Sequence, residues 1–71
     1  MKTCKQLGLS IRNERKRLGV TQADLAMTAG VGLRFLSELE NGKESVHLGK
    51  MLHVTEALGL SFQLHSLGNE Q

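Results

Sequence analysis

The stretch that decides the fold is QADLAMTAGVGLRFLSELEN, which runs from Gln22 to Asn41. Apolar residues recur in it at helical spacing, and a glycine-containing break predicts two helices, over 22–29 and 33–40, joined by a three-residue turn. Two helices that cross steeply need a small residue where they touch and a residue of positive φ in the turn. Ala26 and Gly30 fill these two positions. The block therefore predicts a sharply bent pair of helices.

A further helix is predicted on each side of this block. The first runs over 4–18, where Thr3 and Gln6 have the spacing of a capping box. The other runs from His47 or Leu48 to Leu58. Glycines at 19, 30, 42 and 59 each follow a predicted helix, as the C-terminal turn of a helix favours. We expect the inner face of the first helix to carry Leu7, Ile11, Arg15 and Leu18, and that of the last helix Leu48, Met51, Leu52, Thr55 and Leu58.

The pattern changes after residue 59. Leu60, Phe62 and Leu64 alternate with polar residues, as in a half-buried strand over about 60–66. A single strand leaves its own backbone groups unpaired, so the expected partner is the same strand of a second copy. A frayed last helical turn is the competing interpretation. We expect one domain over 1–67 and a flexible tail over 68–71.

Composition narrows the class of protein. The chain has 71 residues and a net charge of +2, which fits one small domain. Residues 1–43 carry eight basic and four acidic groups, so the positive charge gathers in the first part of the chain. Such a bias suits a polyanion, but it also suits a solvated helix face. The lone Cys4 excludes an internal disulfide. The apolar runs are shorter than a membrane span, and no signal-peptide pattern is present. We therefore expect a cytoplasmic protein.

The bent pair resembles the helix-turn-helix of the lambda-repressor and Cro group, the Xre family. This similarity lies in Thr21–Ala26, Ala29–Val31, Leu39–Lys43 and Ala57–Leu60. It implies an all-α, compact, four-to-five-helix lambda-repressor-like domain. Within the family the sequence is most similar to short HipB-type antitoxins, in which C-terminal strands pair across a dimer. The resemblance therefore implies a homodimer that binds operator DNA, with a HipA-like kinase toxin as a further partner.

The third helix supplies the candidate base contacts. If Leu36 and Leu39 face inward, helical spacing turns Arg34, Ser37 and Glu38 outward. Helices of this kind insert their N-terminal end into the major groove. There an arginine can contact guanine, serine several base edges, leucine a thymine methyl group and glutamate cytosine. Each of these residues is equally compatible with a solvent-facing role. The candidates are Gly32, Leu33, Arg34, Ser37 and Glu38.

Residues that flank the third helix are candidates for phosphate contact, which sets affinity and register. Gln22 begins a helix whose free amides attract phosphate. The resemblance implies this role for its side chain and for the residues Asn41, Gly42 and Lys43. It also implies an ion pair between Arg15, which stands on an apolar helix face, and Glu40.

These features favour a sequence-specific DNA-binding repressor, and they imply the antitoxin of a toxin-antitoxin operon. The alternative is a protein-interaction module of the same fold, for which DNA binding is secondary. An enzyme is not expected, because the sequence has no phosphate-binding glycine loop and no nucleophile motif. The three histidines have no metal-binding spacing, so neither a metal nor another cofactor is expected.

Overall fold

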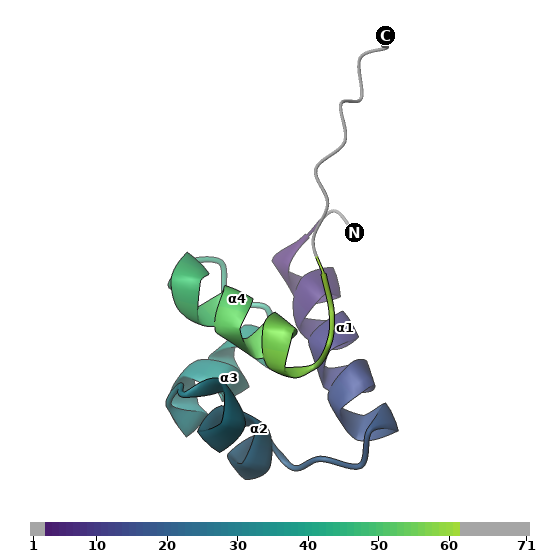
Figure 1. The fold of residues 1–71 in the computed structure, drawn as a ribbon. Coiled ribbons are helices and arrows are strands. Elements are labelled where there is room, and N and C mark those ends of the chain that lie inside the picture. The colour runs from purple at the N-terminus through teal and green to yellow at the C-terminus, as the bar shows by residue number, and fades with distance from the viewer. Residues whose placement is uncertain (1–2, 62–71) are drawn as a thin grey trace, which may run out of the picture.

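A computed structural model describes residues 3–61 of the chain, and the regular structure in that range is entirely helical. Figure 1 shows α1 beside a group formed by the other three helices, with α2 packed on both α3 and α4 and α1 packed on α3. The predicted all-α class is therefore confirmed, with four helices in the described residues. The helices are α1 (Cys4–Arg17), α2 (Gln22–Ala29), α3 (Leu33–Glu40) and α4 (Leu48–Ala57).

Capping residues define where the helices begin. The Thr3 hydroxyl accepts the Gln6 N–H at 3.1 Å and the Gln6 side chain accepts the Thr3 N–H at 3.2 Å, which confirms the predicted capping box. Thr21 caps α2 by accepting the Asp24 N–H at 3.1 Å. His47 caps α4, since its Nδ1 accepts the backbone N–H of Lys50 at 3.2 Å. Local sequence thus fixes three of the four helix starts.

All four helices end in a Schellman motif with a glycine of positive φ. At the end of α3, Gly42 has a φ of 85°. The N–H of Gly42 donates to the carbonyl of Leu39, and the N–H of Lys43 donates to that of Glu38, both at 3.1 Å. This turn places Lys43 back over the last part of α3.

The core is formed by one buried apolar residue on α1, two on each of the other helices and Leu58 at the C-terminal cap of α4. Ile11, Leu36 and Val54 have no solvent exposure. Partly buried residues from the connecting turns, among them Val20 and Val31, pack against this core. The complete buried apolar set is Ile11, Leu25, Ala26, Leu36, Leu39, Met51, Val54 and Leu58.

Two expected inner faces need correction. In α4, Leu48 and Leu52 are 64% and 44% exposed, whereas Val54 is fully buried. The inner stripe of α4 therefore runs through Met51, Val54, Thr55 and Leu58, because α4 packs on α2 along that side. In α1, Leu18 is the C-terminal cap and is 46% exposed, so it lies beyond the buried face.

The predicted C-terminal strand receives no support from the structure. Leu60 and Ser61 lie within the described residues and belong to no strand. Phe62 and Leu64, with the rest of the predicted strand over 60–66 and the predicted tail over 68–71, lie outside the described residues. None of the helices in the described part of the chain is long and apolar enough to cross a membrane.

Candidate nucleic-acid interface

The connection between α2 and α3 is the tight turn that the sequence predicts. Gly30 has a φ of 72°, and the Val31 N–H donates to the Ala26 carbonyl at 3.0 Å. Gly32 then opens α3 in an extended conformation and offers no side-chain cap. The amides of the first turn of α3 are therefore not satisfied by a capping side chain, and they point out of the N-terminal end of the helix.

The exposure of α3 follows the predicted division into two faces. Leu36 and Leu39 are buried, with exposures of 0% and 2%, and Phe35 packs partly buried against the core. The Arg34 side chain is 91% exposed and Leu33 is 51% exposed, while Ser37 and Glu38 are half-buried. The outward residues therefore form a polar strip along α3 with Leu33 at its N-terminal end.

A group of charges lies on this strip. The Glu38 carboxylate contacts Arg34 on the preceding turn, with Nε and Oε2 3.4 Å apart. It also contacts Lys43 in the turn after α3, with Nζ and Oε1 3.3 Å apart. Asn41 donates from its side-chain amide to the Ser37 carbonyl at 2.9 Å, which helps to close the helix. Glu38 thus links a candidate base contact in the first turn of α3, Arg34, with a candidate phosphate contact in the turn after the helix, Lys43.

The remaining candidate, Gln22, takes part in a buried network. Arg15 and Glu40 form the ion pair that the resemblance implies, with Nε–Oε2 at 2.7 Å and Nη2–Oε1 at 3.1 Å. Arg15 also donates from Nη1 to the Val20 carbonyl at 2.9 Å. The Gln22 side chain donates to Glu40 Oε1 at 3.0 Å. One carboxylate therefore ties α1 and the first residue of α2 to the end of α3.

This network shifts the pKa of both charged groups. Burial alone raises the pKa of Glu40, but hydrogen bonds from Arg15 and Gln22 and the charges of Arg15 and Arg12 outweigh it. The pKa of the Glu40 carboxyl therefore lies below its ordinary value. The hydrogen bond to Glu40 raises the pKa of Arg15 despite its burial. Both groups stay ionised at neutral pH, and the pair persists as a charged pair.

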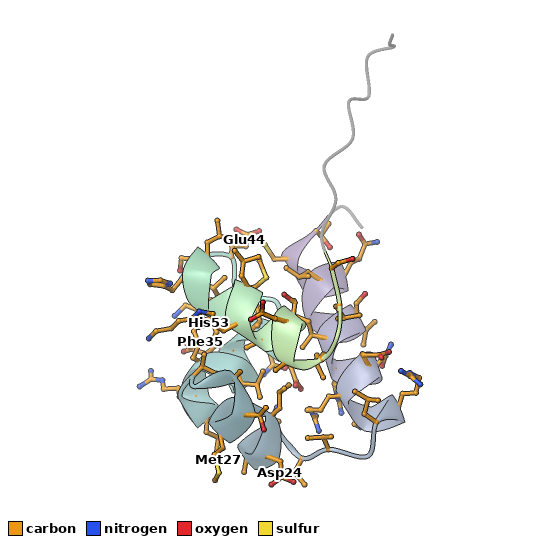
Figure 2. The ribbon with its side chains drawn as sticks, in the orientation of Figure 1. Asp24, Met27, Phe35, Glu44 and His53 are labelled. Atoms are coloured by element: carbon orange, nitrogen blue, oxygen red, sulfur yellow. The ribbon has the colours of Figure 1, made fainter. Side chains whose placement is uncertain are left out.

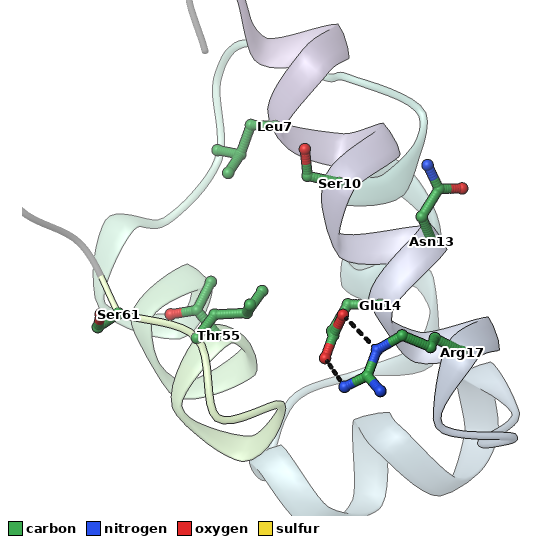
Figure 3. A pocket seen from close by; sticks show the side chains of 8 residues that line it. Leu7, Ser10, Asn13, Glu14, Arg17, Thr55 and Ser61 are labelled. Atoms are coloured by element: carbon green, nitrogen blue, oxygen red, sulfur yellow. Dashed lines mark hydrogen bonds and ion pairs between the residues drawn. The ribbon is translucent and has the colours of Figure 1, made fainter.

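Away from the strip along α3, a cavity of about 410 Å³ lies between α1 and the chain that follows α4 (Figure 3). Its wall includes an ion pair between Glu14 and Arg17, in which Nε donates to Oε1 at 3.0 Å. That hydrogen bond lowers the pKa of Glu14. Within the described residues no three acidic, histidine or cysteine side chains gather as a metal site.

Comparison with known proteins agrees with the helix-turn-helix arrangement of α2 and α3. A family model described as helix-turn-helix matches residues 11–64, which is most of the chain. The chain belongs to the Xre-type helix-turn-helix family. In this chain the bent pair α2–α3 forms the helix-turn-helix, with α1 packed on α3 and α4 packed on α2.

Individual relatives agree with the family assignment. The chain is 39% identical over 71 residues to the uncharacterized HTH-type transcriptional regulator y4mF of Sinorhizobium fredii, covering 100% of this chain and 93% of the relative. Its fold is similar to that of the HipA-HipB-O2-O3 complex, with a TM-score of 0.86, 25% identity and 94% coverage of both chains. It is also similar to the clp gene regulator ClgR from C. glutamicum, with a TM-score of 0.71, 38% identity and coverage of 82% and 75%.

Sequence reasoning missed three contacts of this helix-turn-helix domain. The first is the hydrogen bond from Gln22 to Glu40, and the second is the dual contact of Glu38 with Arg34 and Lys43. The third is the approach of α1 to the end of α3 at Gly8, where an added Cβ would lie 2.7 Å from the Glu40 carbonyl oxygen. A glycine inside an otherwise regular helix, four residues after the capped start, is the signal that could have revealed it.

Proposed function

We propose that this protein is a sequence-specific DNA-binding repressor that covers promoter DNA as a dimer. The observation that carries the proposal is the exposed polar strip of α3, held on a helix whose opposite side is buried at Leu36 and Leu39. A helix fixed in this way presents a constant set of side chains to the major groove. Membership in the helix-turn-helix family supports the same function.

Within this function, the strip and its flanks take different roles. Arg34 contacts a guanine edge or a phosphate, and the neighbouring candidates Gly32, Leu33, Ser37 and Glu38 face the base edges. Phosphate contacts come from the start of α2 and from the turn after α3. These positions are Gln22, Asn41, Gly42 and Lys43.

The proposed dimer pairs the strands over about 60–66, which contain Leu60, Phe62 and Leu64. Two-fold symmetry would place two copies of α3 about one DNA turn (~34 Å) apart on an inverted repeat. The alternation of apolar and polar residues supports the strand. A lone strand needs a partner for its backbone groups, which supports the pairing.

An antitoxin role is the more specific form of the proposal. Its support is the similarity of this fold to HipB in the HipA-HipB-O2-O3 complex. By this reasoning the protein represses its own operon and binds a HipA-like kinase toxin encoded beside it. Co-expression with the neighbouring gene tests this role, and a kinase-like product that copurifies in a defined ratio is the expected result. If the neighbouring product neither copurifies nor is inhibited, the antitoxin role is wrong, and the repressor role is tested separately by DNA binding.

The central experiment measures binding to the DNA upstream of the protein's own gene over a series of salt concentrations. We expect tight binding to that fragment and much weaker binding to an unrelated duplex of equal length. The logarithm of affinity should fall steeply with the logarithm of salt, by about 0.9 per phosphate contact. Equally weak and salt-insensitive binding to both duplexes would overturn the proposal. Capture of a partner protein without any DNA shift would favour the protein-interaction module instead.

A further inference from the structure

Glu38 is the acidic residue at the centre of the proposed DNA-binding strip. Its two carboxylate oxygens contact two different cations, Arg34 at 3.4 Å and Lys43 at 3.3 Å. Arg34 is a proposed base contact and Lys43 a proposed phosphate contact. A single carboxylate therefore neutralises part of the positive charge that the proposed function requires.

The backbone brings these three groups together. Arg34 lies four residues before Glu38, so both side chains stand on the same face of α3. Lys43 returns over Glu38 because its N–H donates to the Glu38 carbonyl at 3.1 Å in the Schellman motif. The contacts therefore follow from the helix and from its C-terminal turn, and they do not need a rearrangement of the fold.

Both contacts are weak enough for DNA to replace them. The side chains of Arg34 and Lys43 are 91% and 47% exposed, and that of Glu38 is 34% exposed. Water and salt screen ion pairs at such exposure. Arginine also precedes glutamate in α3, which is the less favourable order for a pair within a helix. The phosphates of a duplex can therefore compete for both cations.

We infer that Glu38 is a specificity-determining residue, which restrains Arg34 and Lys43 in the free protein and repels phosphate. The inference rests on the proposed function. Binding to unrelated DNA is almost wholly electrostatic, so a negative charge on the strip opposes it directly. Binding to the operator adds base contacts, for which the guanidinium of Arg34 must be positioned. Glu38 thus weakens non-specific binding more than it weakens operator binding.

The test compares Glu38→Gln with a matched control, Glu14→Gln. Both variants remove one negative charge from a glutamate paired with an arginine on its own helix, but Glu14 lies on α1 and pairs with Arg17. Affinities are measured for the upstream fragment and for an unrelated duplex of equal length. We expect Glu38→Gln to tighten binding to the unrelated duplex about two- to fivefold, with a smaller change for the upstream fragment. The ratio of the two affinities therefore falls in Glu38→Gln and stays unchanged in Glu14→Gln.

A third variant tests the positioning of Arg34. In an Arg34→Gln background, Glu38→Gln should lower the affinity ratio by less than it does in the wild-type protein, because Arg34 is no longer present to be restrained. Equal ratios in wild type and Glu38→Gln, or the same fall in Glu14→Gln, would overturn the role of Glu38 while leaving DNA binding established. Failure of the wild-type protein to bind either duplex would overturn both proposals.

Discussion

Arg15 and Glu40 lie 25 residues apart in the sequence and form a two-bond ion pair in the interior, with side chains 10% and 3% exposed. Their charges belong to α1 and to the last turn of α3, the helix proposed to enter the major groove. A buried pair of this kind stabilises a fold only while both partners are present, because removal of one leaves an unpaired charge in the core. The pair therefore couples the stability of the domain to the position of α3.

Removal of either partner of the Arg15–Glu40 pair should destabilise the domain. Glu40→Ala should lower the free energy of unfolding by about 3–5 kcal/mol, because Arg15 is left buried without its partner. Arg15→Met should have a similar effect for the same reason. In the double variant Arg15→Met with Glu40→Leu, the loss should be well below the sum of the two single losses. Urea denaturation measures all three, and strictly additive losses would show that the pair has no net coupling.

Acid should weaken the domain through Glu40. The pKa of this carboxyl is lower in the folded protein than the ordinary 4.5, so the unfolded chain binds the extra proton more readily. The contribution of Glu40 is complete above that ordinary value and is lost as the pH falls through the lower folded value. Thermal unfolding from pH 7 to pH 2 measures the effect. Glu40→Gln should flatten this acid dependence, whereas Glu14→Gln, which removes a half-buried carboxylate paired with the exposed Arg17, should change it less. Identical curves for Glu40→Gln and wild type would contradict the assignment.

Gly8 should resist replacement by alanine. An added Cβ would lie 2.7 Å from the Glu40 carbonyl oxygen and closer still to that of Leu39, and both are backbone atoms that cannot move aside. Overpacking of about 1–3 kcal/mol should exceed the gain of about 1 kcal/mol that alanine brings within a helix. The melting temperature should therefore fall in Gly8→Ala. The control is Gly49→Ala in α4, where the nearest atom belongs to the His47 ring at 3.1 Å, and no comparable fall is expected there.

Two substitutions on the proposed interface should separate base contacts from phosphate contacts. Arg34→Ala should weaken operator binding by about 1–3 kcal/mol and relax the preference at one base pair. Lys43→Ala should weaken binding to all duplexes alike and reduce the salt slope by about 1. Competition assays with single-base operator variants measure the first effect, and binding over a series of salt concentrations measures the second. Unchanged affinities and footprints in both variants would remove these two residues from the interface.

The proposed strand can be tested through the mass of the protein in solution. At micromolar concentration, the wild-type chain should have the mass of a dimer by light scattering. Phe62→Lys should shift the population toward monomer, since a charge replaces an apolar residue of the predicted strand, whereas Gln63→Lys changes a residue of the opposite face and should not. A strictly monomeric wild-type protein would contradict the pairing.

Local sequence predicted the helix bounds because the determinants are local. The capping box at Thr3 and Gln6 and the left-handed turns at Gly30 and Gly42 fix the helix ends within a few residues. The inner face of α4 was predicted correctly at Met51, Thr55 and Leu58 but wrongly at Leu48 and Leu52, and Val54 was missed. The apolar residues of this helix allow more than one stripe at helical spacing. Only the packing of α4 on α2 selects the stripe that contains Val54 and leaves Leu48 exposed.

The candidate site divides in the same way. Helical spacing from Leu36 and Leu39 sufficed to place Arg34 on the outer side of α3. Spacing could not reveal that Glu38 contacts both Arg34 and Lys43, because the second contact depends on how the chain turns after the helix. Residue type also fails to predict exposure on the outer side of α2. Methionine favours cores, but Met27 is 81% exposed and lies beside Asp24 (Figure 2).

The Glu40 carboxylate accepts hydrogen bonds from Arg15 of α1 and Gln22 of α2 while it belongs to α3. A genetic screen for loss of repression should therefore recover substitutions at Arg15 and Glu40 together with those at Arg34. Substitutions at Arg15 or Glu40 would act by breaking the buried network that holds α3 in place. Only substitutions at Arg34 would act by removing a DNA contact. In a reporter strain grown at lower temperature, variants at Arg15 and Glu40 should regain repression, whereas variants at Arg34 should stay defective.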